Sequence, residues 1–73
     1  MTDRECLTEA LRRMNAYKPR QQDATVDALA RLAKRQGLHD DTREALWTAR
    51  HIVRCSSPLL TIGLLAKELE RRI

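Results

Sequence analysis

Apolar residues recur at intervals of three and four along almost the whole chain, and no stretch alternates apolar and polar residues as a half-buried strand does. This spacing predicts four helices, over residues 3–17, 24–36, 42–55 and 58–72. The chain has only two glycines and two prolines, which leaves little turn chemistry for a many-stranded sheet. The sequence therefore predicts an all-α fold, a compact bundle of about four short helices forming a single domain over residues 1–73.

Residues that commonly start or stop helices mark the boundaries of the first two segments. Lys18 precedes Pro19 and should leave the helical region, which ends the first helix there. Asp23 is the expected N-cap of the second helix. Gly37 followed by Leu38 is the pair that closes a helix in a Schellman motif, so we expect the second helix to end just before Gly37.

The third and fourth segments carry start signals of their own. Asp41 and Glu44 have the spacing of a capping box, with the aspartate in the N-cap position. Ser57 is the expected N-cap of the fourth helix, and Pro58 is expected at its first position. These signals leave only short connections, so neighbouring helices should pack against one another.

The small size of the chain limits its core. Domains below roughly 80 residues rarely bury enough apolar surface to be stable alone, and this chain has 73 residues. Aromatic residues make up only 3% of it, so Leu, Ile, Val and Ala must build the core. Association is a common remedy for a small core, and we expect homodimerisation or a target protein to complete this one.

The basic character of the chain is spread thinly along the sequence. Fourteen Lys and Arg residues face ten Asp and Glu residues, a formal net charge of +4, without a run of like charge or a polybasic tail. This pattern is typical of a solvated basic surface as much as of a nucleic-acid-binding one. Most of the cations are arginine, whose planar guanidinium favours specific recognition over simple charge attraction.

Several classes of function are disfavoured by the sequence. Charged residues make up 33% of the chain, which argues against a membrane span, and the charged N-terminal segment lacks an apolar signal region, so we expect a cytoplasmic protein. Cys6 and Cys55 are then expected to be free thiols. His51 and Cys55 share a helix face, but two ligands do not make a metal site, and a nucleophilic pair also needs an orienting group. We therefore expect no metal, no cofactor and no enzymatic activity.

The third predicted helix carries a candidate interaction patch around the only tryptophan. Trp47 points about 160° away from Ala49, the centre of the apolar stripe, at 100° per residue. The patch is completed by cationic residues at helical spacing from Trp47, namely Arg43, Arg50, His51 and Arg54. Trp and Arg dominate interface hot spots, and an arginine over a tryptophan is a favourable cation–π pair. Two interpretations stay open: a partner-binding patch, or Trp47 packed against another helix beneath arginine stems.

The fourth predicted helix is apolar on two sides. One side is a continuous stripe, formed by Leu59, Ile62, Leu65, Ala66, Leu69 and Ile73. Leu60 and Leu64 point nearly the opposite way, and Gly63 between them has no side chain to hold a second helix at a distance. A helix of this kind must be buried on two sides. Leu60, Gly63 and Leu64 are therefore expected either at the centre of the monomer or in a dimer or partner groove.

These features favour a small non-enzymatic protein-binding regulator, such as an inhibitor, an anti-activator or an adaptor. Such a protein occupies a surface on a larger target protein, as small accessory proteins of phages and other mobile elements often do. The Trp47 patch would anchor it on the target, and Leu60 and Leu64 would hold either a second copy or the partner.

The alternative is a DNA-binding transcriptional regulator. The second and third segments resemble a helix-turn-helix around Gly37, with Arg43, Trp47, Arg50 and Arg54 on the recognition helix. Gln36 and Arg43 stand where that motif has apolar packing residues. Asp40 and Asp41 would also approach the DNA phosphates and be repelled, so DNA binding remains the second choice.

Overall fold

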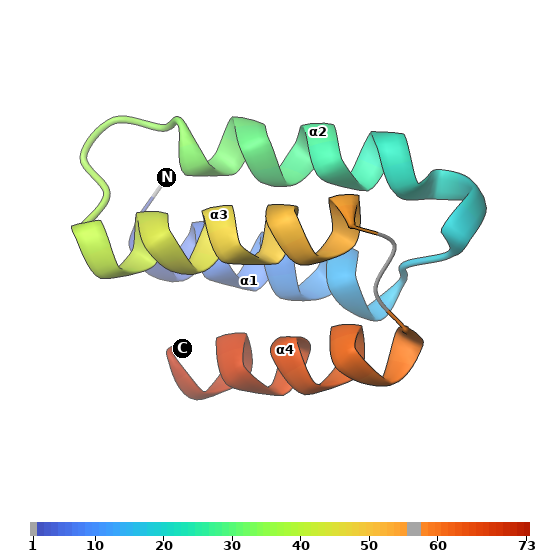
Figure 1. Cartoon of the computed structure of the whole chain (residues 1–73). Helices are drawn as coiled ribbons and strands as arrows, with labels where there is room; N and C mark the ends of the chain where they lie inside the picture. The colour runs from blue at the N-terminus through green and yellow to red at the C-terminus, as the bar shows by residue number, and fades with distance from the viewer. Residues whose placement is uncertain (1, 56–57) are drawn as a thin grey trace.

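The computed structural model describes residues 2–55 and 58–73, and all regular structure in this part of the chain is helical (Figure 1). The elements in chain order are α1 Asp3–Asn15, the 3-10 helix η1 Pro19–Gln21, α2 Gln22–Ala33, α3 Asp40–Arg54 and α4 Leu59–Arg71. The expected all-α bundle of four helices is confirmed.

Consecutive helices run in opposite directions, so the bundle has two distinct ends (Figure 1). One end, which we call the η1 end, holds the end of α1, η1, the start of α2, the end of α3 and the start of α4. The other, the termini end, holds both ends of the chain. α2 packs along α3, and α4 packs mainly on α1, whereas α2 and α4 are not neighbouring helices.

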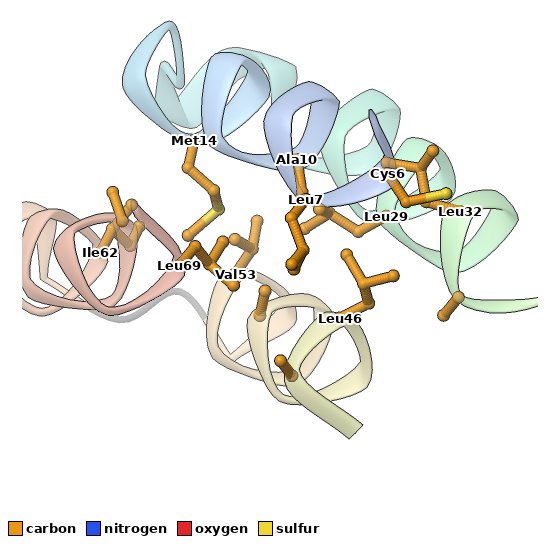
Figure 2. Close-up of a cluster of buried hydrophobic side chains, with 14 of the residues drawn as sticks. Cys6, Leu7, Ala10, Met14, Leu29, Leu32, Leu46, Val53, Ile62 and Leu69 are labelled. Carbon is orange, nitrogen blue, oxygen red and sulfur yellow. The ribbon is translucent and has the colours of Figure 1, made fainter. Parts of the chain in front are cut away.

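Side chains from all four helices meet in one aliphatic core (Figure 2). Leu29 of α2, Leu46 of α3 and Leu69 of α4 are fully buried, and Met14 of α1 points toward Leu69. Cys6 is also buried, and burial raises the pKa of its thiol. The chain's two aromatic residues do not form the centre of this core but pack half-buried at its edge, as the composition requires.

The start of α1 is held by two side-chain contacts. Thr2 and Glu5 form a capping box, in which the Thr2 hydroxyl accepts the Glu5 N–H and the Glu5 carboxylate accepts the Thr2 N–H, both at 3.2 Å. Asp3 accepts the backbone N–H of His39 at 3.0 Å and lies 2.9 Å from its ring Nδ1. Because these hydrogen bonds stabilise the charged forms, the pKa values of Asp3 and Glu5 are lowered.

The boundaries of α2 differ from the expected ones. The 3-10 helix η1 leads directly into Gln22, so Gln21 and not Asp23 occupies the N-cap position. The helix ends at Ala33, before the expected Schellman closure. Gly37 does adopt a left-handed conformation, with φ of +84°, but it lies in the connection to α3.

The starts of α3 and α4 also depart from the expected signals. Asp3 holds the N–H of His39, the N-cap of α3, so the helix begins at Asp40 and the expected Asp41 capping box is not used. Asp40 and Asp41 in this first turn still interact favourably with the positive end of the helix dipole. At α4, Pro58 stands in the N-cap position instead of the first helical one, and the expected N-cap Ser57 lies outside the described residues.

Candidate functional site

Arg43, the first residue of the proposed Trp47 patch, is engaged inside the fold. Its Nη1 donates to the carbonyl oxygen of Ala33 at 2.8 Å, and its Nη2 donates to that of Arg35 at 3.2 Å. These carbonyls belong to the end of α2 and the residues just after it, where a helix leaves acceptors unpaired. The two-pronged guanidinium of Arg43 therefore closes α2, which accounts for the helix ending before Gly37.

Gln22 performs the reciprocal task at the other end of the α2–α3 hairpin. Its Nε2 donates to the carbonyl oxygens of Val53 at 2.8 Å and of Arg54 at 3.1 Å, at the end of α3. Each helix of the antiparallel pair thus supplies a side chain that caps the C-terminus of the other. The local spacing of the sequence could not reveal Gln22, because its acceptors lie more than 30 residues away.

Trp47 and Arg50 form a stacked pair at the edge of the core. The Trp47 ring is half-buried and packs against the core, and the Arg50 guanidinium carbon lies 5.2 Å from the ring centroid. The Arg50 Nε is buried without a hydrogen-bond acceptor among the described residues. The ring therefore contributes to packing beneath an arginine, and its partner-binding role stays a prediction.

His51 and Arg54, the remaining residues of the patch, are exposed at the end of α3, on the η1 end of the bundle. Cys55 is exposed beside them, with its Sγ 3.6 Å from the His51 Nε2. Among the described residues, no group of three or more His, Cys, Asp or Glu side chains is placed to hold a metal ion. His51 and Arg54 are thus accessible cationic or polar groups rather than parts of a ligand cage.

α4 turns a row of apolar side chains to solvent. Leu59, Leu60 and Leu64 are 61%, 77% and 59% exposed, whereas the opposite side of the same helix, including Ile62 and Leu69, is buried. Gly63 is exposed between them, and a Cβ added to it would meet nothing within 4 Å. We call the surface formed by Leu59, Leu60, Gly63 and Leu64 the α4 face. The sequence placed Leu60, Gly63 and Leu64 either at the centre of the monomer or against a second molecule, and the fold leaves them outside the core. Leu59 and Ile73 were expected in the opposite, buried stripe, but they are exposed because they lie at the first turn of α4 and just past its end.

The fold also gathers charge that is dispersed along the sequence. None of the ten Asp and Glu residues falls within residues 10–22 or 45–67, and both stretches lead to or from the η1 end. The exposed cations there include Lys18, Arg20 and Arg54. Asp23 and Asp27 belong to this end as well, but they lie on α2, which is not a neighbour of α4. The α4 face therefore begins at the more positive end of the bundle.

The opposite character appears between α3 and α4 toward the termini end. A hollow of about 320 Å³ there is lined by the carboxylates of Asp41, Glu44 and Glu68 and by one cation, Arg72. Its lining brings no thiol or imidazole next to these carboxylates. The hollow therefore gathers carboxylates beside the hydroxyl of Thr48.

Comparisons with protein-family models, with curated proteins and with solved structures found no match. None of the described helices is both long enough and apolar enough to cross a bilayer. The candidate site therefore rests on geometry alone. It is the α4 face, because the described helices leave its side chains exposed, and His51 and Arg54 are exposed at the same end of the bundle as the start of α4.

Proposed function

We propose that this chain is a small non-enzymatic regulator that acts by docking on a larger protein through the α4 face. The observation that carries the proposal is the exposure of Leu60, at 77%, beside Leu59, Gly63 and Leu64 on a helix whose other side already fills the core. An inhibitor, an anti-activator or an adaptor of a phage or other mobile element would work in this way.

The energetic argument rests on the three leucines. Burial of an exposed leucine side chain contributes roughly 1.5–3 kcal/mol, so covering Leu59, Leu60 and Leu64 offers several kcal/mol to a complex. Exposed apolar patches on a soluble domain commonly mark interaction sites. In the proposed complex His51 and Arg54 contribute a polar rim. Trp47, Arg50 and Arg43 instead stabilise α3 within the fold.

The state of the cysteines bears on the cellular compartment of this regulator. Cys6 and Cys55 are free thiols, which fits a reducing compartment, and we place the protein and its target in the cytoplasm. A homodimer through the α4 face is the other way to cover the leucines. The two occupants make different demands on charge.

DNA binding is the alternative function, and it receives less support. A helix-turn-helix joins its helices at roughly 90–120° through a turn of three or four residues. Here α2 and α3 pack side by side in opposite directions, joined by residues 34–39 (Figure 1). Asp40 and Asp41 are both exposed at the start of α3, where a recognition helix approaches phosphates. The more positive η1 end is the feature that favours this alternative.

The decisive experiment compares three versions of the full chain as bait in cells: the wild type, the Leu60→Glu, Leu64→Glu variant, and a Thr8→Glu, Gln36→Glu control. The control adds the same charge at exposed positions on other elements. We expect at least one protein to be retained by the wild type and the control and lost with the α4 variant. The purified pair should then show at least tenfold weaker binding for that variant by calorimetry.

Two results would contradict this function. Equal capture of all partners by the three baits would show that the α4 face does not dock. Binding of mixed-sequence DNA at low salt, lost steeply as salt rises and unaffected by the Leu60→Glu, Leu64→Glu change, would favour the alternative.

A further inference from the structure

We infer that the occupant of the α4 face is an amphipathic helix whose apolar stripe is bordered by Asp and Glu residues. This inference rests on the proposed docking function and adds the chemistry of the partner. It follows from the shape of the α4 face, from the charges along it, and from the poor match that a second copy of the chain would make.

The shape of the α4 face suits a helix. Leu60 and Leu64 lie one turn apart on the exposed side of α4, and Gly63 leaves open space beside them, with nothing within 4 Å of an added Cβ. A glycine inside a helix is less favourable than alanine, and an open position would accept the alanine side chain. The absence of a Cβ lets another backbone approach closely, so a helix can lie along α4 with its side chains on either side of Gly63.

The charges along the α4 face are mixed: Lys67 has no ion pair among the described residues, whereas Arg71 is paired with Glu68, one turn after Leu64. Lys67 and Arg71 continue the line of Leu60 and Leu64 at helical spacing, and Arg54 lies just before the start of α4. Arg71 contacts Glu68 at 3.4 Å, whereas no Asp or Glu occurs anywhere between Glu44 and Glu68 in the sequence. Carboxylates beside the apolar stripe of a partner helix would face these cations and speed and orient its docking.

A second copy of this chain offers the wrong charges. In a parallel pair of α4 helices, Lys67 would lie beside Lys67 of the other copy. In an antiparallel pair centred on Gly63, Lys67 would instead approach the start of the other α4, in a stretch without Asp or Glu. Because Glu68 already pairs with Arg71 of its own helix, neither arrangement supplies Lys67 with an unpaired carboxylate. The partner is therefore better described as an acidic helix than as the same chain.

An anionic membrane surface also attracts leucines and cations, but it gains nothing from the missing side chain at Gly63. Membrane binding grows with buried apolar area, so a larger side chain at position 63 would strengthen it. The same side chain would obstruct a closely packed helix. The Gly63→Leu variant therefore separates the two kinds of partner by the sign of its effect.

The test uses two labelled synthetic helices of about 20 residues, cross-linked to keep them helical because short isolated helices are marginal in water. Both have the same leucine stripe, bordered by glutamate in one and by lysine in the other. Fluorescence anisotropy with the full-length protein should show the glutamate helix binding at least tenfold more tightly at low salt. The difference should narrow as salt rises, because salt screens exposed charges.

Variants then assign the binding to the α4 face. Leu60→Gln, Leu64→Gln should weaken binding of the glutamate helix at least tenfold, and Arg54→Glu, Lys67→Glu should remove the preference between the two peptides. The matched charge control, Arg31→Glu, Lys34→Glu, changes an exposed arginine on α2 and the exposed lysine at its C-cap and should keep the preference. Circular dichroism confirms that each variant is folded.

Each contrary result has a defined meaning. Equal or tighter binding of the lysine helix overturns the inference. So does tighter binding to phosphatidylserine-containing vesicles that Gly63→Leu strengthens, or a dimer in sedimentation that Leu60→Gln, Leu64→Gln dissolves. If neither peptide binds but the Leu60→Glu, Leu64→Glu bait still loses its cellular partner, the inference fails and the docking function stands. If the bait also keeps every partner, both fail.

Discussion

α3 and α4 both carry large apolar or aromatic side chains on the side away from the centre of the core, but the molecule uses the two sides differently. On α3, Trp47 is half-buried beneath Arg50, and Arg43 closes the end of α2. On α4, Leu60 and Leu64 remain in solvent. The difference arises because α2 packs along α3, whereas no described helix covers the outer side of α4. Exposure after folding, rather than residue type, distinguishes the structural patch around Trp47 from the proposed docking surface on α4.

The largest effect should separate the two sides of α4 itself. Leu69→Ala removes a fully buried side chain and should lower the free energy of unfolding by about 2–5 kcal/mol. Leu60→Ala, on the exposed side, should change it by less than about 0.5 kcal/mol. Urea denaturation of the two variants measures both values. Equal destabilisation would mean that Leu60 is buried in solution, and the comparison between α3 and α4 would fail.

Trp47→Ala should have the next largest effect, because the ring packs on the core and stacks with Arg50. We expect a loss of about 2 kcal/mol, less than for a fully buried tryptophan. The folded variant should still bind the glutamate-bordered helix within twofold of the wild type. If Trp47→Ala keeps full stability and loses partner binding, the roles of α3 and α4 are reversed.

Arg43→Ala should destabilise the chain by about 1–2 kcal/mol, since the carbonyls of Ala33 and Arg35 lose a charged donor. Arg43→Lys keeps the charge but not the two-pronged geometry, so it should restore only part of the loss. Arg54→Ala, at an exposed position of the same helix, is the control and should have little effect on thermal unfolding. A similar loss for both arginines would show that general charge, and not the cap on α2, matters.

Gly63→Ala should change stability and binding in opposite directions. Alanine is favoured over glycine in a helix and meets open space here, so the variant should be more stable by about 0.5–1 kcal/mol. The added methyl group should weaken binding of a closely packed helix severalfold. Thermal unfolding and anisotropy measure the two effects, and a gain in both would remove the argument for close approach at Gly63.

The smallest effect concerns α1, which serves as a reference outside both surfaces. Hydrogen bonds from Arg12 and Arg13 lower the pKa of Glu9 from 4.5 to about 2. The charged carboxylate therefore stabilises the fold above about pH 4.5, and this contribution is lost as the pH falls toward 2. Asp3 and Glu5 act in the same direction. The urea midpoint should fall slightly less on acidification in Glu9→Gln than in the wild type; an identical pH dependence would contradict the role of Glu9.

The number and order of the helices could be predicted because helical periodicity is local information. Several of the helix ends could not be predicted, because the side chains that cap them come from distant parts of the sequence. Arg43 closes α2, Gln22 closes α3, and Asp3 holds the residue before α3. The expected start at Asp41 is overridden by the contact of Asp3 with His39, and the expected start at Asp23 by η1, which leads directly into α2. Gly37 adopts the left-handed conformation, but it lies in the connection between α2 and α3 and not directly after the end of α2.

The candidate site shows the same division. The sequence by itself determined that α4 is apolar on two opposite sides, because residue spacing fixes the direction of each side chain around a helix axis. It also determined that Trp47 lies opposite Ala49. Only the tertiary structure decided which of these surfaces is covered, since coverage depends on the neighbouring helix: α2 shields the outer side of α3, while α4 packs on α1 and leaves Leu60, Gly63 and Leu64 in solvent.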